Sequence, residues 1–241
     1  MIMYPKRTPD QIKRIEDRII EPYVIQNFIT QEEVDHLVSV FENTEQVKTQ
    51  KVTGPITLDI KFFDSDPIVQ KIMAKLEAEI GKFDITAGFF FTATYPHIIH
   101  NDDLKELPEI YRGITIPLKL YGFSGEYPKL CFFDQFYFHG PVKLFAGSEA
   151  EDIPGFYNYH IFDYQDVAYK TTEPFPAEAR EKYFTHLRAK WLEGLSFHSA
   201  IDWVPTSAMI FDSTRIHCAS DFRKNGISMK LAISIFTKKI D

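Results

Sequence analysis

The sequence is poor in cysteine and has no long hydrophobic run, and these two features exclude several classes of protein. Cys131 and Cys218 are the only cysteines among 241 residues, too few for a disulfide framework. No run approaches the roughly 18 apolar residues that a membrane-spanning helix needs. The N-terminal stretch lacks the apolar segment of a secretory signal. We therefore expect a cytoplasmic protein without membrane insertion.

Positive charge is also scarce, with 27 lysines and arginines against 34 acidic residues and a net charge of -7. A net acidic chain gains little from counterion release on a phosphate backbone, which argues against a nucleic-acid partner. The oligomeric state leaves no signal in the sequence.

Aromatic residues are abundant, with 22 phenylalanines and 12 tyrosines. From residue 83 onward, short aromatic and β-branched runs alternate with glycine and proline, which is typical of antiparallel strands. Eight such strands favour a sandwich or jelly roll over a sheet of alternating strands and helices. The expected strands are 85–95, 113–121, 129–138, 142–145, 157–162, 195–204, 208–211 and 227–237.

Helix signals are concentrated in the first 82 residues. Thr30 and Glu33 form a capping box before an apolar stripe that ends near Asn43. Asp66 caps a second helix, which begins at Pro67 and ends at Gly81. Further helices are expected at 8–20 and, between the strands, at about 176–195.

Two histidines and an aspartate stand in a suggestive order. His100 and Asp102 are separated by one residue after a predicted strand, so both side chains can meet one ion. His217 follows the apolar run SAMIFDS, and Lys230 lies within the next strand.

Taken together, these features resemble the Fe(II)- and 2-oxoglutarate-dependent oxygenases, over roughly residues 88–237. The stretches GITIPLKLYG and LCFFDQFYFHGPVKLF also look like this family. The resemblance implies one domain over residues 1–241, mainly β with flanking helices, built as a double-stranded β-helix (a cupin-like jelly roll). Residues 1–82 would be the helical support and 83–241 the jelly-roll core. An inserted helical lid, expected to determine specificity, would span about 147–195.

The resemblance also implies a site. His100, Asp102 and His217 would bind Fe(II), for which imidazole and carboxylate are suitable ligands. The three remaining positions would take 2-oxoglutarate and O2. Lys230 would bind the distal carboxylate of this cosubstrate, and Tyr95 would donate its hydroxyl to it. We expect no catalytic residue beyond the metal ligands.

The implied function is a dioxygenase that hydroxylates a small organic substrate and releases succinate and CO2. Lysine replaces the commoner arginine at position 230, which leaves another 2-oxo acid open. The sequence does not identify the substrate. Two other hypotheses remain: a metal-free jelly-roll module that binds a sugar or metabolite, and a cupin-type metalloenzyme that does not use 2-oxoglutarate.

The other histidines are weaker candidates for metal ligands. His97 lies three residues before His100, and on an extended segment that spacing points the two side chains to opposite sides. We expect structural roles or substrate contacts for His139, His160 and His198, and solvent-facing helical positions for His36 and His186.

Overall fold

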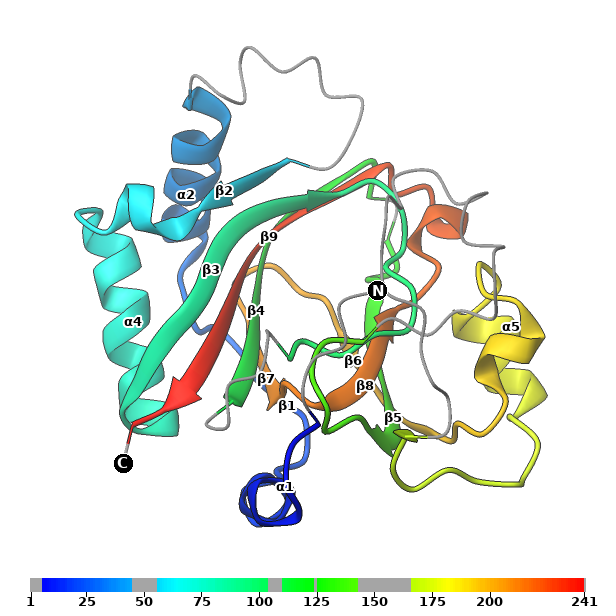
Figure 1. The fold of residues 1–241 in the computed structure, drawn as a ribbon. Coiled ribbons are helices and arrows are strands. Elements are labelled where there is room, and N and C mark those ends of the chain that lie inside the picture. Colours follow the sequence, from blue (N-terminus) through cyan, green and yellow to red (C-terminus); the bar gives the residue numbers. More distant parts are fainter. Residues whose placement is uncertain (1–5, 45–55, 104–109, 124, 143–165, 241) are drawn as a thin grey trace.

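Two antiparallel sheets form the body of the molecule (Figure 1). The computed structural model describes residues 6–44, 56–103, 110–123, 125–142 and 166–240. The larger sheet has the strand order β1-β7-β4-β9-β3-β2, and the smaller sheet has the order β6-β5-β8. The strands are β1 (Tyr23–Ile25), β2 (Thr57–Asp59), β3 (Phe83–Ala93), β4 (Ile110–Tyr121), β5 (Lys129–Phe136), β6 (Phe197–Asp202), β7 (Ala208–Asp212), β8 (Arg215–Ala219) and β9 (Met229–Lys239).

Helices α2 (Gln31–Asn43) and α4 (Pro67–Ile80) cover one face of the larger sheet (Figure 1). The predicted caps are confirmed, because the Thr30 hydroxyl accepts the backbone N–H of Glu33 and the Asp66 carboxylate accepts that of Ile68. Apolar side chains of both helices and of the sheet form one buried cluster, which includes Leu37, Phe41, Ile72, Leu76, Phe90, Ile116 and Ile233.

Strands β4, β7 and β9 of the larger sheet are buried on both faces, which explains their nearly continuous apolar runs. On β9, Leu231, Ile233 and Ile235 pack beneath the helices. Ala232 instead belongs to a core between the two sheets, together with Trp203, Met209 and residues of β5 and β6. Because side chains alternate along a strand, Lys230 shares the inner face with Ala232.

Two predicted helices are shorter than expected. The helix expected at 8–20 is α1 (Pro9–Glu16). The expected helix at 176–195 is wrong as one continuous element, since it consists of α5 (Ala177–Tyr183) and a 3-10 turn at Ala189–Leu192. The chain bends between them because it buries apolar side chains against the outer face of the smaller sheet, namely Phe184, Leu187, Trp191, Leu192 and Leu195.

Six of the eight expected strands are present, with ends shifted by a few residues. The expected strand at 157–162 and most of that at 142–145 lie outside the described residues, as do residues 147–165 of the expected lid. β1, β2 and β8 were missed. β1 and β2 have three residues each, too few to show a periodic pattern, and β8 is buried along its whole length and shows no alternation. The division into one domain with a lid stays a prediction. Across the described ranges, no helix is both long and apolar enough to cross a bilayer.

Candidate metal centre

The structure brings the three predicted metal ligands together. The ligand atoms of His100, Asp102 and His217 all lie within 4.8 Å of one another. His100 Nε2 is 3.6 Å from Asp102 Oδ1, and His217 Nε2 is 3.5 Å from Asp102 Oδ2. Ligand atoms that each lie about 2.1 Å from one ion are roughly 3 to 3.6 Å apart at ordinary coordination angles. The two histidine–carboxylate distances therefore suit a single divalent ion.

Backbone pairing explains why residues far apart in sequence meet here. His100 and His217 form an antiparallel bridge, in which each backbone N–H donates to the other's carbonyl at 2.9 and 2.8 Å. Residues directly opposite in such a bridge project to the same side. Their ring centroids are accordingly 4.3 Å apart. Asp102 follows two residues later and is held by its own N–H, which donates to the Ser213 carbonyl at 2.8 Å.

Both imidazole rings are oriented for metal binding. His100 Nδ1 lies 2.6 Å from the Ile98 carbonyl oxygen, and His217 Nδ1 lies 2.9 Å from that of Arg215. A carbonyl oxygen can only accept, so Nδ1 carries a proton in each ring, and Nε2 is the nitrogen that the neutral ring offers to a metal. Such a backbone partner fixes the tautomer and the direction of a histidine ligand.

Apolar rings and a glycine enclose this cluster. The Phe211 and Phe132 rings lie 4.8 and 5.9 Å from the His217 ring. A Cβ added to Gly113 on β4 would be 2.7 Å from Phe211 Cε2 and 3.2 Å from Asp102 Oδ2. Glycine at this position thus leaves room for the carboxylate ligand. This role of Gly113 could not be predicted from the sequence, since nothing near Gly113 in the chain indicates the contact.

Lys230, the predicted cosubstrate ligand, lies on the inner face of β9 and is 5% exposed. Its Nζ is 5.0 Å from the centre of the Trp203 ring and 4.9 Å from that of Phe222. Burial lowers the pKa of Lys230 to about 8. Among the described residues no carboxylate pairs with it. A buried ammonium group of this kind is suited to a ligand carboxylate.

Tyr95 lies beyond the end of β3 and is 39% exposed. The Arg223 guanidinium stacks over its ring at 4.4 Å, and the same group donates to the Thr94 carbonyl at 3.4 Å. Tyr95 therefore forms part of a cation–π pair at the surface. Its contact with a cosubstrate stays a prediction.

Two expectations about the other histidines were wrong. His97 Nδ1 lies 3.4 Å from His100 Nε2, with the rings perpendicular, because residues 94–99 are not a regular strand and do not alternate. His186 follows α5 instead of lying on a solvated helix face, and burial lowers its pKa to about 4.

The remaining histidines lie away from the cluster or outside the described residues. His36 is exposed, as expected, with Nε2 2.7 Å from Asp66 Oδ2. His198 contacts the carboxylates of Asp134 at 2.7 Å and Glu21 at 2.6 Å. His139 is partly buried, and burial lowers its pKa. His160 lies outside the described residues.

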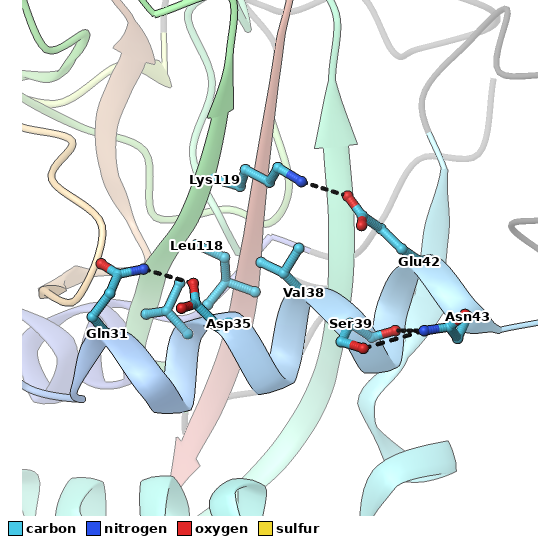
Figure 2. A pocket seen from close by; sticks show the side chains of 9 residues that line it. Gln31, Asp35, Val38, Ser39, Glu42, Asn43, Leu118 and Lys119 are labelled. Carbon is cyan, nitrogen blue, oxygen red and sulfur yellow. Dashed lines mark hydrogen bonds and ion pairs between the residues drawn. The ribbon is translucent and has the colours of Figure 1, made fainter.

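A hollow of about 340 Å³ lies elsewhere, between α2 and β4 (Figure 2). Its polar groups are already paired with one another: Lys119 with Glu42 at 2.7 Å, and Gln31 with Asp35 at 2.8 Å. None of the three predicted metal ligands lines it. We therefore place the functional site at the histidine cluster and not in this hollow.

No protein-family model matches the sequence, and no curated protein matches it. Solved structures do match. The crystal structure of the epimerase SnoN in complex with Fe3+, alpha ketoglutarate and nogalamycin RO is 12% identical and superposes with a TM-score of 0.51, covering 96% of this chain and 85% of that chain. The non-heme alpha ketoglutarate dependent carbocyclase SnoK from nogalamycin biosynthesis is 8% identical, with a TM-score of 0.51 and coverage of 99% and 87%. These likenesses confirm the predicted jelly-roll fold.

Proposed function

We propose that this protein is an Fe(II)- and 2-oxoglutarate-dependent oxygenase that hydroxylates a small organic substrate and releases succinate and CO2. The observation that carries the proposal is the convergence of two Nε2 atoms and one carboxylate within 4.8 Å. The fold supports it, since SnoN was crystallised with Fe3+ and alpha ketoglutarate and SnoK is alpha ketoglutarate dependent.

In this proposal His100, Asp102 and His217 hold the iron. Two imidazoles and one carboxylate suit Fe(II) and leave coordination positions open for other ligands. When bound, iron and 2-oxoglutarate together supply the oxidising chemistry with O2. The protein's own part is to hold both rings through their Nδ1–carbonyl hydrogen bonds. The rings of Phe132 and Phe211 pack against His217 and would help to exclude water on that side.

Lys230 is proposed to bind the distal carboxylate of 2-oxoglutarate. Its ammonium group is buried against two aromatic rings and has no acidic partner among the residues described. A carboxylate placed there would compensate a charge that burial otherwise disfavours. The Tyr95 hydroxyl is proposed as a second donor to the cosubstrate.

Hydroxylation is the proposed outcome, but the fold also occurs in an epimerase and a carbocyclase. Mass spectrometry of the product distinguishes these reactions once a substrate is found by screening metabolite pools for succinate release. A gain of one oxygen atom supports hydroxylation. An isomer of the substrate, or a loss of two hydrogen atoms, contradicts hydroxylation and leaves the metal centre in place.

The proposal is tested by adding Fe(II) and 2-oxoglutarate to the apoprotein without oxygen. We expect a visible charge-transfer band, which His100→Ala and His217→Ala abolish. His36→Ala is the matched control, because His36 is exposed and lies outside the cluster. A colourless mixture with the wild-type protein would contradict the proposal. Metal-dependent turnover that ignores 2-oxoglutarate would favour a cupin-type metalloenzyme, and metal-independent ligand binding would favour a binding module.

A further inference from the structure

A buried ion pair involves Asp103, the residue that follows the proposed metal ligand Asp102. Arg7 Nη1 and Nη2 donate to the two carboxylate oxygens of Asp103 at 2.5 and 3.0 Å. The side chains are 4% and 0% exposed. Arg7 Nη1 also donates to the Phe138 carbonyl at 2.7 Å. The N-terminal segment before α1 is thus joined to the residue that follows Asp102.

We propose that Arg7 is a positioning residue for the metal ligand Asp102. It acts through Asp103, whose backbone is continuous with that of Asp102, and it does not touch the metal itself. This inference rests on the proposed function of the three-residue cluster. It adds a contribution from a segment that lies 96 positions from Asp103 in the sequence.

The geometry shows two anchors with Asp102 between them. On one side, the Asn101 side chain accepts the N–H of Val142 at 2.8 Å and donates to the carbonyls of Tyr137 and Gly140 at 3.2 and 3.1 Å. On the other side, Arg7 clamps Asp103. The Asp102 carboxylate must face both histidines at 3.5 and 3.6 Å, so its backbone direction matters. Partners that orient a ligand commonly change metal affinity about 10- to 100-fold when removed.

Loss of the Arg7 guanidinium would change the direction of Asp102 through the side chain of Asp103. Without the guanidinium the buried Asp103 carboxylate loses the two donors that fix its direction, so the Asp103 side chain is free to rotate. That rotation would change the neighbouring peptide and the direction of Asp102. Lysine at position 7 keeps the charge but cannot form the two-pronged contact, so Arg7→Lys should disturb the ligand less than Arg7→Ala.

The test measures Co2+ binding to the apoprotein by calorimetry, together with the visible spectrum of the Co2+ form. We expect Arg7→Ala to weaken Co2+ binding about 10- to 100-fold and to change the spectrum, with Arg7→Lys intermediate. Lys6→Ala is the matched control, since Lys6 is the adjacent residue and its partner Asp166, at 2.6 Å, is reached through an exposed ion pair. Circular dichroism establishes that each variant is folded.

The outcomes separate this inference from the proposed function. Folded Arg7 variants that bind Co2+ with the wild-type affinity and spectrum would overturn it, because Arg7 would then serve stability alone. Should Arg7→Ala fail to fold, Arg7→Lys decides the question by the same criterion. If the wild-type protein binds no Co2+, the proposed metal centre falls and this inference falls with it.

Discussion

Lys230 is a residue whose charge depends strongly on its surroundings. Burial lowers its pKa to about 8, while the groups that act on it do not titrate near that pH. Burial raises the pKa of the thiols of Cys131 and Cys218, which stay neutral, and lowers the pKa of His186 to about 4. Among these groups, Lys230 is therefore the one expected to change its charge near pH 8.

We predict that 2-oxoglutarate binding weakens as the pH rises through about 8. A carboxylate ligand prefers the protonated lysine, so deprotonation removes the attraction. Lys230→Arg keeps its charge across this range and should show a flatter profile. Anaerobic titrations of the Fe(II) protein from about pH 7 to about pH 9.5 measure this difference. Equal slopes for both proteins would exclude Lys230 as the titrating group.

Burial of the charged Lys230 side chain should also lower the free energy of unfolding. Lysine in the unfolded chain binds its proton up to about pH 10.5, whereas folded Lys230 releases it near 8, so the free energy of unfolding rises with pH between these values. Below pH 8 the full cost is present. Lys230→Met should therefore stabilise the apoprotein at pH 7 by about 1 to 3 kcal/mol, measured by urea unfolding, while 2-oxoglutarate binding is lost. An unchanged or lower stability would show that the charge is not penalised.

Among the elements, β4 contributes to the site through Gly113, which has no side chain. Gly113 leaves space that Phe211 and the Asp102 carboxylate occupy. Gly88 on β3 is equally crowded, since an added Cβ would lie 2.6 Å from Ile60 Cγ2, but its neighbours are Ile60 and Ile85. A substitution at Gly88 therefore tests the effect of crowding on stability alone. A substitution at Gly113 also crowds the Asp102 carboxylate.

We predict that Gly113→Ala and Gly88→Ala each destabilise the protein by about 1 to 3 kcal/mol through overpacking. Gly113→Ala alone should also weaken metal binding, because the added methyl group displaces the Asp102 carboxylate. Thermal unfolding and Mn2+ titration of the apoproteins measure the two effects. Equal metal affinity for both variants would contradict a role for Gly113 at the site.

Helices were predicted correctly where a capping pattern marks their first residue. The capping box of α2 and the Asp66 cap of α4 were correct, because a cap involves residues at most three positions apart. The helix at 176–195 was wrong, since contacts of Phe184 and Trp191 with the smaller sheet bend the chain. Tertiary packing overrides helix propensity there.

At the scale of the whole molecule, the proposed metal would join two parts of the chain that are distant in sequence. His100 and Asp102 follow β3, whereas His217 lies on β8 of the smaller sheet. An ion held by all three would connect these segments in the folded state only. Metal binding should therefore stabilise the complete fold.

We predict that Mn2+ raises the melting temperature. The free energy of unfolding should rise by about 3 kcal/mol when the free Mn2+ concentration is about 100 times its Kd. His217→Ala should remove the shift, because one ligand is lost. His36→Ala should keep it, since His36 contacts Asp66 at the start of α4. Differential scanning fluorimetry measures the shift, and a shift that persists in His217→Ala would place the ion elsewhere.

Residue order along the chain was enough to predict the capped helices and most strands of the two sheets, because capping and alternation act between near neighbours, whereas the residues of the metal cluster were predicted from a family resemblance. Only the folded structure decided which groups meet. The approach of His97 to His100, the burial of His186 and the Arg7–Asp103 pair could not be inferred locally. These contacts depend on irregular backbone and on packing between segments up to 96 positions apart, which no short-range pattern encodes.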